Sequence, residues 1–205
     1  MFRIRPAECR EIQRVRHLDT DESLMLRFGR GDAAAFEALY RRHEAGVFRF
    51  LLRHLHSQAG ATDAMQEVWF AVARSADRYQ PTAKFTTWLF TIAHHRMVDA
   101  IRAHRPTEVL EMNADSSDVP VIDHMPAADA GTEPLNALES RERDAALLIA
   151  VEQLPPEQRA AFLLQMEGNL SVEDIAAVTG TSFETAKSRL RYARAKLRLL
   201  LLEFA

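Results

Sequence analysis

Basic side chains recur at helical spacing near the end of the chain, where they could bind a polyanion. The four residues are Lys187, Arg191, Arg194 and Arg198. No acidic residue lies between Glu184 and Glu203 to balance them. A cationic stripe of this kind matches the phosphates of duplex DNA. An ordinary solvated helix face is the alternative interpretation.

The elements that must position this stripe form a predicted helix-turn-helix. Ser171 with Asp174, and Thr181 with Glu184, have the spacing of helix-start capping boxes. Gly180 between them is typical of a helix end, so the turn is short and the second helix projects. The second helix also has an apolar stripe one residue round from the basic one, which predicts a buried face. That stripe consists of Ala186, Leu190, Ala193, Leu197 and Leu201.

Residues that could carry out catalysis are poorly arranged. His94 and His95 are adjacent and would point about 100° apart on a helix. His54 and His56 have the same difficulty if they are helical. No His-Glu-x-x-His motif, nucleophile elbow or phosphate-binding loop occurs. We therefore expect no enzymatic activity and no metal or cofactor site. A helical enzyme, which could be metal-dependent, is the rival class that these arrangements argue against.

Composition indicates a globular protein of the cell interior. The chain has 205 residues, of which 47% are hydrophobic and 27% charged, enough for one large core or two small ones. Cys9 is the only cysteine, so no disulfide framework or thiolate zinc site can form. No apolar run reaches the roughly 18 residues of a membrane span. We expect a cytoplasmic location.

The order of patterns along the chain predicts an all-α fold of two helical domains joined by a flexible linker. Residues 1–20 form an arginine-rich N-terminal extension, and residues 21–105 form a four-helix domain. In that domain Asp32 is predicted to cap the second helix, Thr62 or Asp63 to open the third, and the fourth to run from Phe85 to about His104. Residues 106–137 have many acids, four prolines and no lysine or arginine, which predicts a linker. Residues 138–205 form the helix-turn-helix domain.

Four motifs in this order resemble the extracytoplasmic-function sigma factors of bacterial RNA polymerase. They are Gly31-Asp32-Ala33-Ala34-Ala35-Phe36, Asp63-Ala64-Met65-Gln66-Glu67-Val68-Trp69, Phe85-Thr86-Thr87-Trp88-Leu89-Phe90-Thr91-Ile92-Ala93 and Leu154-Pro155-Pro156-Glu157-Gln158-Arg159. The resemblance covers about residues 21–105, the sigma-two domain, and 138–202, the sigma-four domain. It implies a factor that binds core RNA polymerase and selects promoters.

By this resemblance, sigma-two binds a coiled coil of the polymerase's largest subunit and melts the minus-ten element. The implied core-polymerase-binding residues are Asp63, Gln66, Glu67 and Trp69. An extruded base would be captured by Tyr79, Lys84, Phe85 and Trp88. Trp88 is equally compatible with a place in the core. The polar DNA face comprises His95, Arg96, Asp99 and Arg102, with a solvated surface as the alternative.

Sigma-four, by the same resemblance, binds the flap of the second-largest subunit and reads the minus-thirty-five element. The implied DNA-binding residues are Ser182, Phe183, Thr185, Lys187, Ser188, Arg189, Arg191, Tyr192 and Arg194. Arg189 is expected to contact a base edge or a nearby phosphate, while Arg191, Arg194 and Arg198 grip the backbone. Glu184 serves as a cap. The acidic linker is expected to thread toward the active-site cleft and RNA exit channel, or to act as a passive tether.

Thr62 marks a departure from the family pattern. Members typically carry Asp-Ala-Glu-Asp where this chain has Gly60-Ala61-Thr62-Asp63, so carboxylates are missing from the polymerase-binding surface. Phosphorylation of Thr62 by a serine/threonine kinase would restore nearly two negative charges at a helix N-terminus. A plain helix cap at Thr62 is the alternative. Without a kinase, an anti-sigma factor is the usual control in the family.

The sequence also leaves open a second class of DNA-binding protein. A helix-turn-helix regulator acting without core polymerase would form stable dimers on a palindromic operator. The first domain, however, has neither the strands of a receiver nor a sustained heptad seam.

Overall fold

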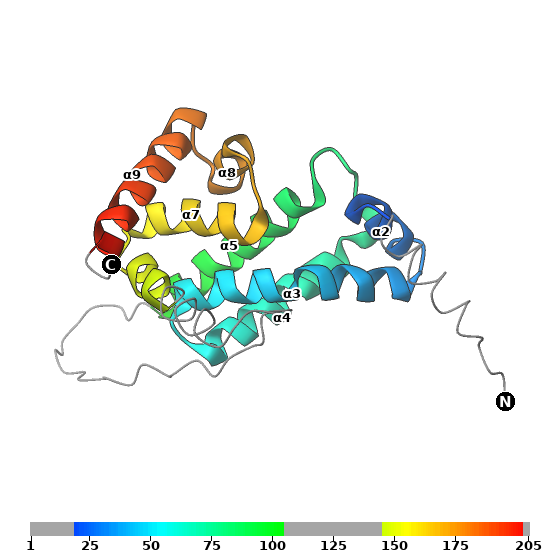
Figure 1. The fold of residues 1–205 in the computed structure, drawn as a ribbon. Coiled ribbons are helices and arrows are strands. Elements are labelled where there is room, and N and C mark those ends of the chain that lie inside the picture. The colour runs from blue at the N-terminus through cyan, green and yellow to red at the C-terminus, as the bar shows by residue number, and fades with distance from the viewer. Residues whose placement is uncertain (1–18, 105–144, 203–205) are drawn as a thin grey trace, which may run out of the picture.

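The structure is a computed structural model that describes residues 19–104 and 145–202, and within these segments all regular elements are helical (Figure 1). The predicted all-α fold is confirmed. The first segment, here the N-terminal unit, contains α2 (Asp21–Phe28), α3 (Ala33–Leu55), α4 (Gln58–Arg74), the short 3-10 helix η1 (Ala76–Arg78) and α5 (Phe85–His104). The second, the C-terminal unit, contains a helical stretch at 145–152, α7 (Pro156–Gly168), α8 (Val172–Thr179) and α9 (Phe183–Leu202). The predicted linker and nearly all of the predicted extension lie outside the described residues.

The turn between α2 and α3 forms as predicted. The Asp32 carboxylate accepts hydrogen bonds from the backbone amides of Ala34 and Ala35, which caps α3. The same carboxylate lies 2.6 Å from the Arg27 guanidinium, which ties the end of α2 to the start of α3. Gly29 ends α2 where a β-carbon would stand 2.4 Å from the Ala76 carbonyl oxygen. A side chain there would push η1 away.

The start of α4 differs from the prediction. The helix begins at Gln58, four residues before Thr62, and Ser57 caps it by accepting from the Gly60 amide at 3.1 Å. His56 ends α3 in a left-handed conformation with φ 51°, so only two residues separate the helices. Gly60 lies in the first turn of this helix, where one glycine lowers helix stability by only about 1 kcal/mol. α4 ends at Arg74.

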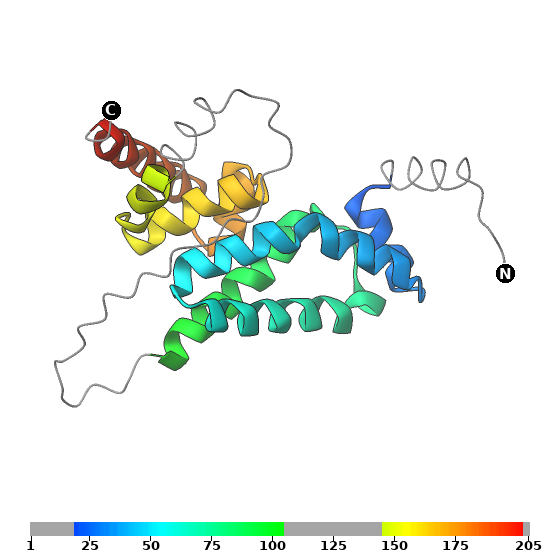
Figure 2. The ribbon, with the colours of Figure 1, turned by 60° about the horizontal axis from the view of Figure 1, so that its bottom comes forward.

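The core of the N-terminal unit lies among α3, α4 and α5, with α2 packed across one end (Figure 2). Phe50 of α3 meets Phe90 of α5 edge to face, with ring centroids 5.6 Å apart. The largest fully buried side chains of this unit are Met25, Leu39, Val47, Phe50, Leu51, Val68, Val72, Phe85, Leu89 and Phe90. This tight core fixes the exposed faces of α4 and α5.

The helix-turn-helix of the C-terminal unit has the predicted form with one changed cap. Ser171 and Asp174 make the capping box of α8, and Gly180 ends that helix at φ 63°. At the start of α9, Ser182 rather than Thr181 caps the helix, because its hydroxyl accepts from the Thr185 amide at 3.2 Å. The predicted apolar stripe is buried at Ala186, Leu190, Ala193 and Leu197, with Leu201 half-buried.

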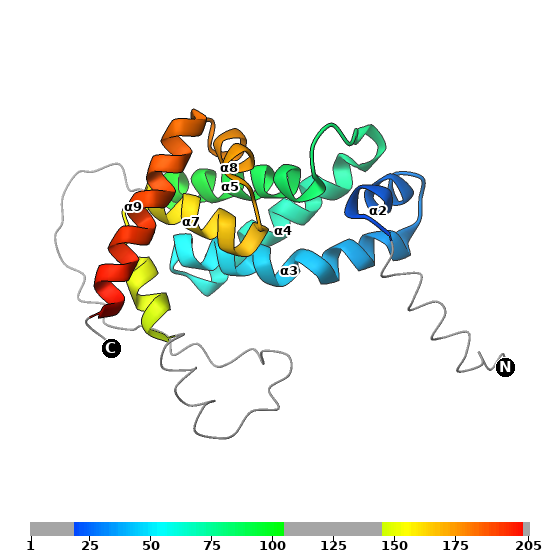
Figure 3. The same ribbon diagram turned by 45° about the horizontal axis from the view of Figure 1, so that its top comes forward.

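The two units pack directly against each other, a contact that the sequence did not predict. α7 lies on α3 and α5, and α8 lies on α5, so both separate most of α9 from the N-terminal unit (Figure 3). Gly168 permits part of this contact, since a β-carbon there would come within 3.0 Å of the Phe90 ring. One buried apolar cluster therefore runs through both units.

Candidate nucleic-acid and polymerase interfaces

The predicted DNA-reading helix α9 presents a cationic surface. Lys187, Arg191 and Arg194 are exposed, as are Phe183 at 40% and Tyr192 at 53%. Ser182 and Thr185 are also exposed, while Ser188 is half-buried. The stripe Ala186, Leu190, Ala193 and Leu197 is buried one residue round the helix, so the cations lie on the neighbouring exposed face. This arrangement suits contact with a duplex backbone.

Local contacts order several of these cations. The Arg191 guanidinium stacks on the Tyr192 ring at 4.9 Å, and Arg194 donates to the Gln165 side chain of α7 at 2.6 Å. Lys187 lies 3.9 Å from the Glu184 carboxylate and over the Phe183 ring. Glu184 is therefore a weak surface partner of Lys187 and not the cap of α9. The exposed Lys187–Glu184 ion pair costs little to break when phosphates approach.

Arg189 is half-buried, unlike the exposed cations Lys187, Arg191 and Arg194 of the same helix. Burial lowers the pKa of His94 on α5, and the charges of His95 and Arg189 lower it further. The charge of the residue predicted to read a base edge is therefore felt at α5.

The aromatic residues predicted to capture a base are mostly in the core, which corrects that prediction. Phe85 is fully buried and Tyr79 is 9% exposed. Burial raises the pKa of Tyr79 to about 12, with the charges of Glu22 and Asp21 adding to the shift. Trp88 is half-buried and packs edge-on against Tyr79 at 5.0 Å. Tyr79 and Phe85 pack into the core around the start of α5, so Trp88 alone of these three aromatic residues keeps an accessible edge.

Lys84, also predicted to contact the minus-ten DNA, is exposed but already has a partner in the C-terminal unit. Its ammonium lies 3.2 Å from the Asp174 carboxylate of α8. The Thr87 hydroxyl donates to the other oxygen of that carboxylate at 2.8 Å. Burial would raise the pKa of Asp174, but hydrogen bonds from Ser171, Thr87 and Lys84 outweigh it and lower the pKa to about 2. Asp174 is thus ionised at neutral pH.

The predicted polar face of α5 is present. His95, Asp99 and Arg102 are exposed, and Arg96 is half-buried with its guanidinium 3.9 Å from Asp99. These residues lie along one side of α5 beyond Trp88, at the spacing of successive helical turns.

The face of α4 predicted to bind polymerase is exposed at Asp63, Gln66 and Glu67. The prediction that Trp69 binds polymerase is corrected, because its side chain is only 5% exposed. It packs against Phe36 and Tyr40, with ring centroids 5.8 and 4.9 Å away. Phe70, which was not predicted, is 61% exposed on the same face. Its spacing of three from Glu67 and seven from Asp63 was the signal that could have identified it.

Thr62 is not a helix cap, so the alternative interpretation of this residue as a plain cap is wrong. It lies in the second turn of α4, half-buried, and its hydroxyl donates to the Gln58 carbonyl at 2.9 Å. It precedes the exposed face of Asp63, Gln66 and Glu67 directly.

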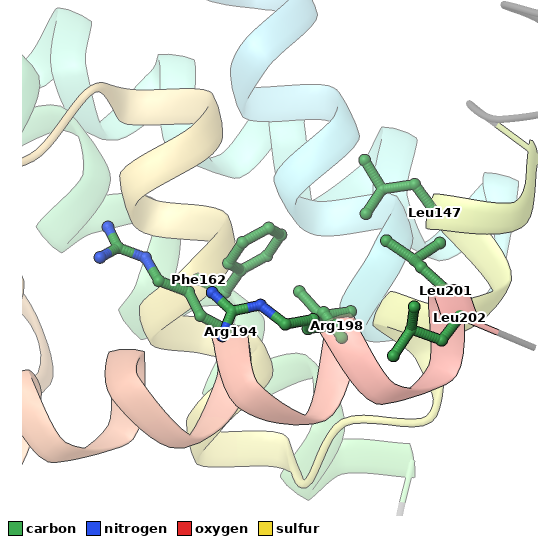
Figure 4. Close-up of a pocket in the computed structure, with 7 residues that line it drawn as sticks. Leu147, Phe162, Arg194, Arg198, Leu201 and Leu202 are labelled. Atoms are coloured by element: carbon green, nitrogen blue, oxygen red, sulfur yellow. The ribbon is translucent and has the colours of Figure 1, made fainter. Parts of the chain in front are cut away.

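An open groove of about 430 Å³ lies on the C-terminal unit between the 145–152 helix, α7 and the end of α9 (Figure 4). Its lining is Leu147, Phe162, Arg194, Leu197, Arg198, Leu201 and Leu202. Leucines and Phe162 form its floor and Arg194 and Arg198 its edge, so it suits an apolar segment that carries some negative charge.

The described segments contain neither a metal site nor a membrane span. In residues 19–104 and 145–202, no group of three or more histidine, cysteine or carboxylate side chains is placed to hold a metal ion. None of the helices described is long and apolar enough to span a bilayer.

Comparisons with known proteins match both units to one family. The family model for sigma-70 region 2 matches residues 39–107, and that for sigma-70 region 4 matches residues 144–197. RNA polymerase sigma factor CarQ of Myxococcus xanthus is 35% identical over 177 residues, covering 86% of this chain and 95% of CarQ. ECF RNA polymerase sigma factor SigM of Mycobacterium tuberculosis is 32% identical over 190 residues, covering 91% and 87%.

The fold is also that of solved structures. The sigma factor RpoE of Bartonella quintana, in complex with the anti-sigma factor NepR, superposes with a TM-score of 0.55 at 22% identity, covering 76% of this chain and 89% of that chain. CnrH, in complex with the cytosolic domain of CnrY, superposes with a TM-score of 0.63 at 23% identity, covering 91% of this chain and 100% of that chain. At this identity the likeness concerns the fold alone. From the paired region 2 and region 4 matches and the relatives above 30% identity, the chain belongs to the extracytoplasmic-function sigma factors of the sigma-70 family, alternative sigma factors that bind core RNA polymerase and direct promoter-specific transcription initiation.

Proposed function

We propose that residues 21–105 act as the sigma-two domain and residues 138–205 as the sigma-four domain, each with one polymerase-binding and one DNA-binding surface. The observation that carries this assignment is the cationic face of α9, which is exposed next to a buried apolar stripe and has Glu184 as its one acidic neighbour on the described helix. Chemistry on the nucleotides belongs to the polymerase, so the chain itself catalyses nothing. Its place of action is the cytoplasm, where the polymerase and DNA are.

The polymerase-binding surface of sigma-two is the exposed face of α4, made by Asp63, Gln66, Glu67 and Phe70. Its two carboxylates suit a basic partner, and Phe70 adds an aromatic anchor of the kind that dominates protein interfaces. Trp69 supports this face from inside the core and does not touch the partner.

The minus-ten surface follows α5 from Lys84 through the exposed edge of Trp88 to His95, Arg96, Asp99 and Arg102. Phosphates bind the cations, and the edge of Trp88 offers a surface for an unstacked base. Tyr79 and Phe85 hold Trp88 in place by ring packing.

Sigma-four reads the minus-thirty-five element with the start of α9, and the groove of Figure 4 receives an apolar segment of the polymerase flap. The groove lies toward the C-terminal end of α9, while the base-reading residues lie at its N-terminal end. One helix therefore serves both partners, with Arg194 and Arg198 lying where the two surfaces meet.

Phosphorylation of Thr62 is the proposed activation step. A phosphate at Thr62 would stand beside Asp63 and close to the α4 N-terminus, where added negative charge favours both the helix and a basic partner. The hydroxyl donates to the Gln58 carbonyl, so this hydrogen bond has to break before a kinase can transfer a phosphate to it. An anti-sigma factor is the alternative control, since the sigma factor RpoE of Bartonella quintana has been solved in complex with one, NepR.

The test compares binding of fluorescently labelled core RNA polymerase to four proteins: the native chain, Thr62→Ala, Thr62→Ser and the Thr62 phosphoprotein. The phosphoprotein is expected to bind at least about tenfold more tightly than the native chain, with Thr62→Ala resembling the native chain. Thr62→Ser controls for the hydroxyl and remains open to phosphorylation. Equal affinities in all four would remove the kinase step, whereas no binding by any of them would contradict the proposed function.

A further inference from the structure

We propose that Glu22 of α2 is a positioning residue for the minus-ten surface, because its side chain caps the start of α5 and thereby fixes the loop and the aromatic edge that capture a base. The Glu22 carboxylate accepts a hydrogen bond from the backbone amide of Phe85, the first residue of α5, at 2.7 Å. The inference rests on the proposed assignment of the minus-ten surface to α5. The sequence alone did not single out Glu22.

The residue just before α5 cannot cap it. The first amides of a helix have no partner inside the helix, and a side-chain oxygen of the preceding residue commonly accepts from one of them. Here that residue is Lys84, whose ammonium can only donate, and the first turn of α5 contains no acidic residue. Glu22 supplies the acceptor from 63 positions earlier in the chain. Its carboxylate also suits the positive end of the helix dipole.

The helix that carries Glu22 is fixed to α3 by the neighbouring acidic residue. The Asp21 carboxylate lies 2.7 Å from the Arg42 guanidinium and 2.8 Å from a ring nitrogen of His43. The His43 ring in turn lies beside the Phe85 ring, with centroids 5.5 Å apart. Helices α2, α3 and α5 therefore meet at Phe85, and the Glu22 carboxylate is held in place from α3.

The loop before α5 is closed at its base by two buried aromatic residues. Tyr79 and Phe85 stand at its two ends, with ring centroids 6.3 Å apart and edge to face. Residues 80–84 between them are all exposed, and the Thr82 amide donates to the Gln80 carbonyl at 2.8 Å. The loop thus projects into solvent from a fixed base. Its α5 end is held by ring packing and by the Glu22 hydrogen bond.

Glu22 also acts on the other end of this loop. Burial raises the pKa of Tyr79 to about 12, and the charges of Glu22 and Asp21 add to the shift. Helix α2 contacts both α5 and η1, the short helix that directly precedes Tyr79. One helix therefore braces both ends of the loop.

Trp88, the aromatic edge of the proposed minus-ten surface, lies one helical turn beyond the capped amide. The Trp88 amide donates to the Lys84 carbonyl at 3.2 Å, and its ring packs on Tyr79 and Phe85 with centroids 5.0 and 5.7 Å away. Without Glu22, the Phe85 amide has to turn to water, which frays this first turn. Lys84 and Trp88 then lose their fixed relation, and ordering them again counts against binding of a base.

The test measures base capture by holoenzyme. Core RNA polymerase is saturated with the native chain, Glu22→Ala, Glu22→Gln or Ser57→Ala and added to a promoter that the native holoenzyme transcribes. An adenine of the minus-ten element is replaced by 2-aminopurine, whose fluorescence rises when it leaves the base stack. Glu22→Ala is expected to lower the equilibrium constant for opening about fivefold, the effect of losing one cap. Glu22→Gln keeps an acceptor oxygen and should stay within about twofold of the native chain.

Ser57→Ala is the matched control for a loss of stability alone. Ser57 caps α4 by accepting from the Gly60 amide, so this variant also removes one helix cap from the N-terminal unit but leaves α5 intact. Urea titrations should show lowered unfolding midpoints for both Glu22→Ala and Ser57→Ala, whereas only Glu22→Ala should lose opening. Affinity of Glu22→Ala for core polymerase should match that of the native chain. An equal loss of opening in the two variants would overturn the positioning role.

The outcomes separate the two proposals. If the native holoenzyme opens no promoter, the proposed function fails. If it opens promoters and Glu22→Ala opens them equally well, the positioning role is wrong while the sigma function stands. Should Glu22→Ala fold poorly, Glu22→Asp decides the matter, because its shorter side chain keeps the charge but cannot keep the 2.7 Å bond. It is expected to lose opening as Glu22→Ala does, and opening at the native level would overturn the proposal.

Discussion

The Lys84 ammonium and the Asp174 carboxylate lie 3.2 Å apart although 90 residues separate them in the chain. One belongs to the loop before α5 and the other to the first turn of α8, so this pair joins the two units of the sigma factor. Lys84 belongs to the proposed minus-ten surface, and Asp174 belongs to the capping box of α8.

Reversing a charge on the exposed face of α4 should weaken polymerase binding. Glu67→Lys is expected to lower affinity for core polymerase at least about tenfold, because it places a cation against a basic partner surface. Glu37→Lys, on the exposed side of α3, is the control. Fluorescence anisotropy with labelled protein measures both, and equal affinities would exclude this face from the interface.

Replacing the neighbouring aromatic residues should separate binding from stability. Trp69→Ala removes a buried ring packed on Phe36 and Tyr40 and is expected to lower the free energy of unfolding by about 3–5 kcal/mol in urea titrations. Phe70→Ala removes a ring that is 61% exposed, so it should leave the unfolding midpoint nearly unchanged while weakening polymerase binding. A reversed pattern would mean that the two side chains have been placed wrongly.

The buried His54 ring should make stability fall in acid. Burial lowers its pKa to about 4, and the charges of Arg159 and the nearby histidines add to the shift, against a hydrogen bond that the ring donates to the Phe50 carbonyl. The unfolded chain takes up this proton near pH 6.5 and the folded chain only near pH 4. The stability contributed by neutral His54 is thus fully present above about pH 6.5 and is lost as the pH falls to about 4, by about 3 kcal/mol.

The variant His54→Phe tests this directly. Urea unfolding at pH 7 and pH 4.5 should show a smaller loss of stability in the variant than in the native chain, while the exposed-site control His95→Gln should follow the native chain. An equal loss in all three proteins would show that His54 does not control the acid response.

The cations of α9 should determine the salt dependence of DNA binding. Arg191→Gln removes one proposed phosphate contact and is expected to reduce the slope of log affinity against log salt by about 1 for a holoenzyme on a promoter duplex. Arg30→Gln, an exposed arginine after α2, should leave the slope unaltered. A slope unaffected by Arg191→Gln would place that residue off the DNA backbone.

Local signals predicted the helices and most of their ends, but not the contact between units. Asp32, Ser171 and Gly180 act through hydrogen bonds or backbone angles a few residues away, so sequence spacing was enough to assign them. Ser57 was missed as a cap because Gly60 suggested a loop, and Trp69 was assigned to the wrong side because a motif says nothing about packing against Phe36. The contact of Asp174 with Thr87 and Lys84 joins residues that lie 87 and 90 positions apart in the chain. No local sequence pattern predicts such a pairing.

Run-off transcription by core RNA polymerase over a library of promoter duplexes tests the central claim most directly. With the purified chain, in its native or its Thr62-phosphorylated form, we expect transcripts from a subset of templates that share two sequence blocks, and none from polymerase alone. Transcription from no template in either form, or the same templates used with and without the chain, would contradict its role in promoter selection.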